Sequence, residues 1–188
     1  MSHIIITGTG RTGTTFLVQL YTILGFDTGF SDIKENYHKN CNAGMEINPF
    51  GTKNLPHIIK YPGLCDRLGD FLEKGNKIEE VIVPIRKIDD VVRSRIKVQG
   101  NSIESVKGGL WETNIPNKQK EILLNKFYSL IYSITEYELN CTFIRFPEMI
   151  NNPKYLYIKL FRKHMKYDNF KKGFDKIVNP KLVSHFKD

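Results

Sequence analysis

The N-terminal segment contains a glycine-rich loop whose residues could bind an anion. Residues 7–15 read Thr-Gly-Thr-Gly-Arg-Thr-Gly-Thr-Thr, so one guanidinium, that of Arg11, and several hydroxyls stand among three glycines. Backbone N–H groups, hydroxyls and a fixed cation are the donors that bind phosphate-like oxyanions, above all where a helix begins. The segment therefore predicts a site for a phosphate or a related anion.

A phosphate loop needs a strand before it and a helix after it. Ile4–Ile6 is a β-branched run typical of a buried strand, and Phe16–Leu24 carries apolar residues at helical spacing. The glycines fit both the dinucleotide template GxGxxG and the first half of the template GxxxxGK[ST]. No apolar strand precedes Asp27 or Asp32, which disfavours a dinucleotide site. Thr14 replaces the lysine of ordinary nucleoside triphosphatases, which disfavours ATP hydrolysis.

A second candidate anion site follows a later strand. Val81–Ile85 is apolar enough for a buried strand and leads to Arg86, and Ser94 follows eight residues later in a helical stretch. A guanidinium at a strand end and a hydroxyl on the next helix can converge on one phosphate. Arg93 and Arg95 flank the serine, and we expect both on the solvated face of this helix.

Together these segments resemble the sulfotransferase family, which uses 3′-phosphoadenosine 5′-phosphosulfate. Arg11–Phe16 matches the family's 5′-phosphosulfate loop position by position, and Val81–Ser94 fits its 3′-phosphate element. The resemblance implies transfer of a sulfuryl group to a hydroxyl or amine of a small-molecule or glycan acceptor, with 3′-phosphoadenosine 5′-phosphate as product and no metal. The cofactor-binding residues that it implies are Gly10, Arg11, Thr12, Gly13, Thr14, Thr15, Phe16, Arg86 and Ser94.

Two weaker similarities lie nearer the C-terminus. Phe146–Pro153 resembles the family's turn from a strand into a helix, whose role is structural. Lys171-Lys172-Gly173 resembles the Arg-Lys-Gly element that closes over the 3′-phosphate, so Lys172 and Gly173 join the candidates for cofactor binding. A basic solvated turn is the alternative interpretation of that segment.

The resemblance also implies how catalysis would work. Sulfuryl transfer depends on positioning and on charge stabilisation, by analogy with phosphoryl transfer. Arg11 would lie on the sulfuryl oxygens, and Lys60, which follows the apolar residues 58–59, is the second catalytic cation. Pro62 stands where cytosolic members of the family carry their histidine base, so the base must be another residue.

We favour Glu46 as that base. It follows Ala43-Gly44-Met45, a small and apolar setting that would desolvate the carboxylate and favour its protonated form. Asp32, Glu35 and His38 are the alternative bases, and all of them lie in a region, residues 25–56, that shows no regular period.

Strands and helices alternate along the rest of the chain. His57–Tyr61, Val81–Ile85 and Cys141–Phe146 are the further predicted strands, and residues 64–74, 89–98, 118–139 and 153–163 are predicted helices. The basic stretch from Lys166 onward is amphipathic but predicts no definite structure. The alternation predicts an α/β fold, a P-loop-type parallel sheet flanked by helices, in a single domain that spans residues 1–188.

The composition excludes several classes of protein. The chain has 188 residues and a net charge of +8, which favours an anionic partner and disfavours a disulfide scaffold. Its three cysteines are far apart and lack CxxC spacing, as in a reduced cytoplasmic protein without a zinc site. No apolar run approaches the roughly 18 residues of a membrane span. We expect no membrane or nucleic-acid partner, and a homo-oligomer stays open.

Two other functions compete with a sulfotransferase. A P-loop kinase for a nucleotide or small molecule would require ATP and Mg²⁺, and the missing Gly-Lys-Ser/Thr speaks against it. A basic polyanion-binding module with an inactive nucleotide loop would account for the charge, but no motif typical of DNA or RNA binding accompanies the lysines.

Overall fold

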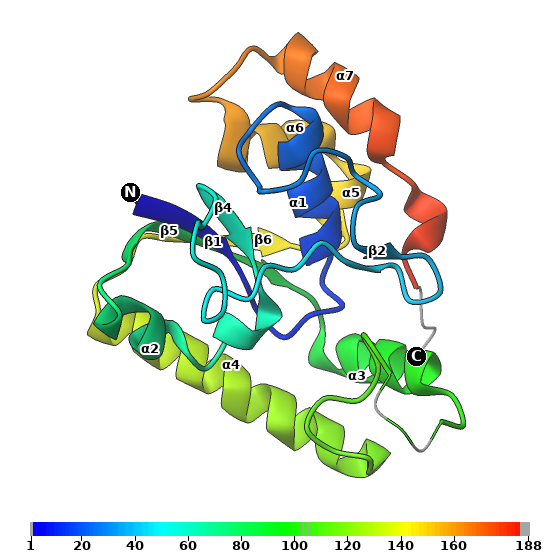
Figure 1. The fold of residues 1–188 in the computed structure, drawn as a ribbon. Helices are drawn as coiled ribbons and strands as arrows, with labels where there is room; N and C mark the ends of the chain where they lie inside the picture. Colours follow the sequence, from blue (N-terminus) through cyan, green and yellow to red (C-terminus); the bar gives the residue numbers. More distant parts are fainter. Residues whose placement is uncertain (1, 103, 105, 185–188) are drawn as a thin grey trace.

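A four-stranded parallel sheet forms the centre of the molecule. The computed structural model describes residues 2–102, 104 and 106–184. The strands β1 (Ser2–Ile6), β4 (Ile58–Lys60), β5 (Lys77–Ile85) and β6 (Cys141–Arg145) lie in the order β4-β1-β5-β6. All neighbouring strands in this sheet are parallel (Figure 1). With helices on both faces, this arrangement confirms the predicted α/β class.

Alternate residues of the strands support two separate cores. Ile4 and Ile6 of β1 pack into one core with α1 (Thr14–Ile23) and α7 (Tyr167–Ile177). Ile5, which points to the other face, packs into a second core with residues of α2 (Leu68–Glu73) and α4 (Gln119–Glu136). The period of two along β1 therefore places apolar side chains on both faces of the sheet, as expected for a strand covered by helices on each side.

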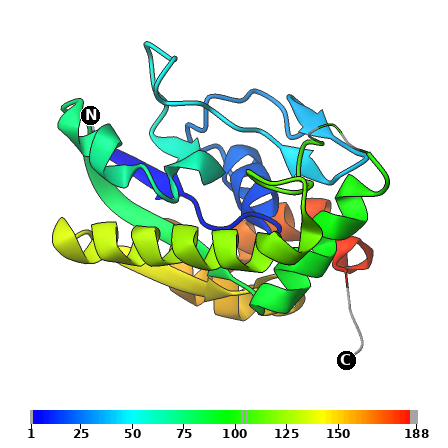
Figure 2. The same cartoon turned by 90° about the horizontal axis from the view of Figure 1, so that it is seen from below.

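The helices divide between the two faces. Figures 1 and 2 show α1 and α7 on one face of the sheet and α4 along the other. The helix α3 (Ile88–Gln99) packs against α4. The short helices α5 (Glu148–Asn151) and α6 (Pro153–Leu156) follow β6 and lie on the α1 side of the sheet.

The structure corrects two predicted helices. The helix expected at residues 64–74 is shorter, because a 3-10 turn occupies Pro62–Leu64 and α2 begins only at Leu68. Residues 153–163 do not form a continuous α-helix, because α6 passes into a π-helical turn at Tyr157–Phe161. Within it, the N–H of Arg162 donates to the carbonyl of Tyr157, 2.9 Å away. The wider turn accompanies burial of two consecutive residues, Leu160 and Phe161, in the core around α1.

Two segments without a predicted structure contain regular elements. In the region 25–56, Tyr37–His38 (β2) and Ala43–Gly44 (β3) form a small antiparallel hairpin. The basic C-terminal stretch contains α7, whose apolar face buries Phe170, Gly173 and Phe174. Among the described residues, none of the helices is both long and apolar enough to span a bilayer.

The strand order determines where a ligand can bind. From β1 the chain first adds β4 on one side and then crosses to add β5 on the other side of β1. In open α/β sheets, ligands bind beyond the carboxyl ends of the strands at such a reversal of strand order. The glycine-rich loop after β1, Lys60 at the end of β4 and Arg86 after β5 all lie at this edge.

Candidate functional site

The glycine-rich loop connects β1 to α1 through left-handed backbone conformations. Gly8, Gly10 and Gly13 have φ values of 132°, 67° and 83°, and Arg11 has a φ of 55°. Positive φ is common for glycine and uncommon for arginine, and strained residues of this kind concentrate at functional sites. Gly13 is the N-cap of α1, so the loop delivers its N–H groups to the positive end of a helix.

Side chains pack so closely on this loop that a Cβ atom on two of its glycines would force neighbouring side chains to move. A Cβ atom on Gly10 would lie 2.7 Å from Nη2 of Arg95, and one on Gly13 would lie 2.2 Å from Cε of Met149. The Thr12 hydroxyl is buried beside them without a hydrogen-bond partner among the described residues. The positive φ values and these close contacts together explain why glycine stands at positions 10 and 13.

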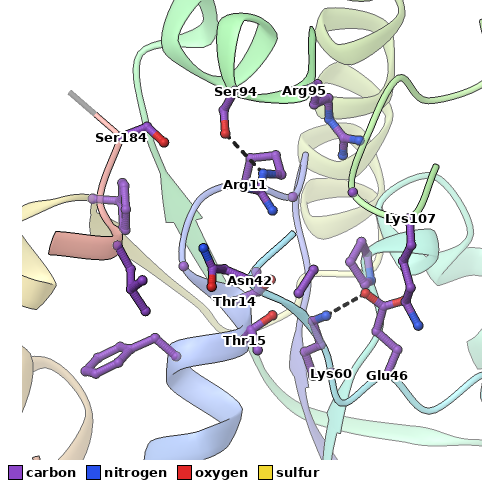
Figure 3. Close-up of a pocket in the computed structure, with 18 of the residues that line it drawn as sticks. Arg11, Thr14, Thr15, Asn42, Glu46, Lys60, Ser94, Arg95, Lys107 and Ser184 are labelled. Atoms are coloured by element: carbon purple, nitrogen blue, oxygen red, sulfur yellow. Dashed lines mark hydrogen bonds and ion pairs between the residues drawn. The ribbon is translucent and has the colours of Figure 1, made fainter. Parts of the chain in front are cut away.

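Arg11 extends from the loop between two other parts of the chain. Its Nε donates to Oγ of Ser94 at 3.1 Å, and its Nη1 donates to the carbonyl of Cys41 in the β2–β3 hairpin. Burial lowers the pKa of the Arg11 guanidinium, which nevertheless stays charged at neutral pH. The structure thus joins the two predicted anion sites directly, through the Arg11–Ser94 hydrogen bond (Figure 3).

Arg86 supports the loop from the end of β5. Its side chain is only 5% exposed, and its Nη1 donates to the carbonyl of Arg11 at 3.2 Å. Its Nη2 donates to the carbonyl of Ser184, and its guanidinium lies 5.2 Å from the centre of the Phe146 ring. The carboxylate of Asp90 lies beside this guanidinium, with Oδ2 3.8 Å from Nε. Burial lowers the pKa of Arg86, as it does for Arg11.

Lys60 and Glu46 form an ion pair at the other side of the loop. The ammonium of Lys60 is 2% exposed and donates to Oε1 of Glu46 at 2.6 Å and to the carbonyl of Gly44 at 2.9 Å. Burial lowers the pKa of Lys60 more than the charge of Glu46 raises it. The expected apolar setting of Glu46 is therefore wrong, because its carboxylate, 27% exposed, faces an ammonium.

One cavity of about 390 Å³ is lined by most of these side chains. Its apolar lining residues include Phe16, Phe146, Ile150, Leu182 and Val183, and Arg86 contacts both Phe146 and Ser184 in this part of the lining. The polar end contains Lys60, Glu46 and Lys107, which lie together on the right in Figure 3, and Tyr37 and Asn42 are further polar residues of the lining. In Figure 3 Arg11 and the threonines of the loop lie between Ser184 on the left and the Lys60–Glu46 pair on the right.

The cavity is strongly electropositive. Its described lining carries the cations Arg11, Lys60, Arg86, Arg95 and Lys107, whereas Glu46 is the only carboxylate in that lining. Such a concentration of buried cations is stable only where counter-charges or anionic ligands compensate it, because desolvation penalises each charge. The arrangement is suited to a ligand with several negative charges.

The structure brings most of the predicted site residues into this cavity. They are Gly10, Arg11, Gly13, Thr14, Thr15, Phe16, Glu46, Lys60, Arg86 and Ser94. Thr12 lies in the same loop, but its hydroxyl is buried beneath the lining.

Lys172 and Gly173 do not line the cavity. Both lie within α7, where Gly173 packs so closely against α1 that a Cβ would lie 2.5 Å from Cδ2 of Leu24. Their expected contact with a 3′-phosphate is therefore corrected: Gly173 permits two helices to pack, and Lys172 lies outside the cavity.

The alternative bases also lie outside the cavity lining. Glu35 accepts hydrogen bonds from the N–H and the hydroxyl of Ser31, which lower its pKa, and Asp32 accepts from the N–H of Lys34. His38 is exposed in the β2–β3 hairpin, and only its main chain takes part in the described hydrogen bonds. Among the carboxylates and histidines considered, Glu46 is the one that reaches the cavity.

Three parts of the cavity wall were not predicted. Arg95 is buried rather than solvated, with 6% of its surface exposed. Its spacing from Val91 and Ser94, four and one residues away, places all three on one face of α3, and this signal is visible in the sequence. The wall formed by residues 106–111 and the segment around Leu182 and Val183 carry no such signal, because irregular chain positions them.

The comparisons with known proteins add no family assignment. No family model matched the chain, and neither a curated protein nor a solved structure showed significant similarity to it. The function must therefore be inferred from the site itself.

Proposed function

We propose that the protein is a sulfotransferase that uses 3′-phosphoadenosine 5′-phosphosulfate. The single observation that carries this proposal is the Arg11–Ser94 hydrogen bond, because it joins the loop expected at the 5′-phosphosulfate to the element expected at the 3′-phosphate. Two anion sites in one cavity suit a nucleotide with phosphates at both ends of its ribose. The apolar part of the lining offers Phe16 and Phe146 to the base.

The residues present fit such a donor. The N–H groups and hydroxyls of the loop, with Thr14 and Thr15 at the start of α1, would bind the 5′-phosphate. Arg86 and Ser94 would bind the 3′-phosphate, and Arg11 would lie on the bridging and sulfuryl oxygens.

The acceptor would occupy the polar end of the cavity. Its oxygen would form a bond to sulfur while the bond between sulfur and the bridging phosphate oxygen breaks, and the phosphate leaves with that electron pair. Glu46 would take the hydroxyl proton, and Lys60, 2.6 Å from Glu46, would stabilise the carboxylate and the developing negative charge. A small-molecule or glycan hydroxyl is the acceptor class that we propose.

Calorimetric titration tests the donor class. Adenosine 3′,5′-bisphosphate should bind more tightly than ATP with Mg²⁺ or NAD. The bridging oxygen that Arg11 would contact in the donor remains on the 5′-phosphate of the bisphosphate, so the variant Arg11→Asn should weaken its binding by about tenfold or more, because a charge-assisted hydrogen bond is worth roughly 1.5–3 kcal/mol. Asparagine tolerates the left-handed backbone at position 11. Arg162→Ala, which removes an exposed arginine outside the cavity, is the matched control. Tighter binding of ATP with Mg²⁺ would favour a kinase instead.

A further inference from the structure

Arg95 is a deeply buried cation beside the glycine-rich loop. It belongs to α3, directly after Ser94, and lines the cavity. Its Nη2 donates to the carbonyl of Thr9 and its Nη1 donates to the carbonyl of Gly109, both at 2.6 Å. One guanidinium therefore connects the glycine-rich loop to the wall formed by residues 106–111.

The contact with Thr9 fixes the orientation of a peptide group in the loop. Because the peptide bond is planar and trans, the N–H of Gly10 points in the direction opposite to the Thr9 carbonyl and therefore away from Arg95. Arg86 acts in the same way on the next part of the loop, since it donates to the carbonyl of Arg11 and turns the N–H of Thr12 away from itself. Two arginines thus set the directions of two loop N–H groups.

The second contact of Arg95 belongs to a wall that is itself firmly tied. The N–H of Leu110 donates to Oε1 of Gln99, and the N–H of Trp111 donates to Oε1 of Gln119. The guanidinium of Arg95 also lies 5.0 Å from the centre of the Trp111 ring. Because α3 and α4 hold this wall, Arg95 links the loop to a rigid support rather than to a mobile one.

The charge of Arg95 lacks a carboxylate partner among the described residues. Its Nε is buried without a hydrogen bond, and burial lowers the pKa of the guanidinium to about 10. Burial of a cation whose hydrogen bonds go only to carbonyl oxygens costs free energy, because the charge is desolvated without a carboxylate partner. Such a residue is expected where it serves a further purpose. The steric fit points the same way, since any Cβ at position 10 would collide with Arg95.

We propose that Arg95 is a positioning residue, which holds the glycine-rich loop in its anion-binding shape by tying the Thr9–Gly10 peptide to the 106–111 wall. The nature of the anion rests on the proposed function, but the clamp itself does not. Arg95 acts through the loop N–H groups and adds a positive charge behind them.

Two measurements on folded protein test this proposal. Arg95→Met removes both hydrogen bonds, Arg95→Lys can retain one of them, and Lys97→Met removes an exposed cation from the same helix as a control. NMR order parameters of the amides of residues 8–13, without ligand, report the clamp directly. Calorimetric titration with adenosine 3′,5′-bisphosphate reports its effect on binding.

The expected result is graded. In Arg95→Met the loop order parameters fall from about 0.85 to below about 0.6, and bisphosphate binding weakens by about tenfold to a hundredfold. In Arg95→Lys both the loop order parameters and the bisphosphate affinity should lie between those of Arg95→Met and the wild type. In Lys97→Met both should equal the wild-type values.

The proposal is overturned if the loop is as rigid in both Arg95 variants as in the wild type, even if thermal stability or binding declines. Should Arg95→Met fail to fold, the order parameters of Arg95→Lys decide in the same way. If the wild type itself does not bind the bisphosphate, the proposed function fails, while the order parameters still decide whether Arg95 is a clamp.

Discussion

At the scale of single residues, the site is defined by buried cations that contact backbone carbonyls. Three arginines, Arg11, Arg86 and Arg95, each donate a hydrogen bond to at least one carbonyl of another segment. They therefore stabilise the conformation of the loop region and also give it positive charge. Arg11 and Arg86 could be predicted from the sequence because each stands at a fixed place in a motif. Arg95 was placed wrongly on a solvated face, since the contacts that bury it come from the loop and from residue 109, far apart in sequence.

Lys60 predicts a distinctive dependence of stability on pH. Burial lowers its pKa in the folded protein, so between that value and 10.5 the unfolded chain binds more protons than the folded one. Linkage then requires the free energy of unfolding to rise with pH through this alkaline window. At pH values below the folded-state pKa of Lys60, the free energy of unfolding is reduced by the full cost of burying the charged ammonium.

The measurement compares wild type with Lys60→Met. Urea unfolding between pH 7.5 and 10.5 should give a stability difference, wild type minus variant, that increases with pH. A difference that stays constant or decreases over this range would contradict a lowered pKa for Lys60 and the burial that causes it.

At the scale of elements, hydrophobic periodicity predicted most helices and strands, and irregular packing accounts for the failures. The long helix was expected at 118–139 and is found at Gln119–Glu136, because its apolar spacing is regular. The π-helical turn at Tyr157–Phe161 and the hairpin of β2 and β3 depend on tertiary contacts. At Gly44, for example, a Cβ would lie 2.0 Å from the carbonyl oxygen of Asn36, a contact that no local pattern predicts.

Gly13 and Gly75 have nearly equal positive φ values but different surroundings. Comparing alanine variants at the two positions therefore distinguishes the cost of the left-handed backbone from the cost of steric overlap. Gly13, the N-cap of α1, has a φ of 83°, and Gly75, after α2, has a φ of 82°. A Cβ on Gly13 would collide with Met149 and Phe146, whereas one on Gly75 would meet nothing within 4 Å.

We expect Gly75→Ala to cost about 1–2 kcal/mol for the left-handed backbone alone. Gly13→Ala should cost about 1–3 kcal/mol more, because it also overpacks the junction between the loop, β6 and α5. Urea unfolding gives both values. Equal costs for the two variants would show that the loop does not pack against Met149 as described.

At the scale of the whole molecule, the net charge of the chain and the charge of the cavity lining are both positive. The chain carries +8, and the cavity concentrates cations at the reversal of strand order. The sequence could predict the sign of the cavity's charge and the sheet edge at which the cavity lies, since both follow from composition and from the order of strands and helices. It predicted Lys60 and Glu46 but not Tyr37, Asn42 and Lys107, because residues of the hairpin and of the 106–111 wall reach the cavity only in the folded chain.

This charge distribution should steer an anionic nucleotide to the cavity. Stopped-flow association of adenosine 3′,5′-bisphosphate should slow by about tenfold between 20 mM and 500 mM salt, while dissociation changes less. An association rate constant that does not change with salt concentration would contradict electrostatic steering. Salt-sensitive binding of generic duplex DNA at similar affinity would favour a polyanion-binding module.

The most direct test of the account asks whether Arg86 distinguishes nucleotides by their 3′-phosphate. Adenosine 3′,5′-bisphosphate and adenosine 5′-phosphate differ only in that group, so their dissociation constants for wild type and Arg86→Ala form a closed comparison. The account predicts that wild type prefers the bisphosphate by about tenfold to a hundredfold and that Arg86→Ala loses this preference. Equal binding of both nucleotides by the wild type, or an unchanged preference in Arg86→Ala, would contradict it.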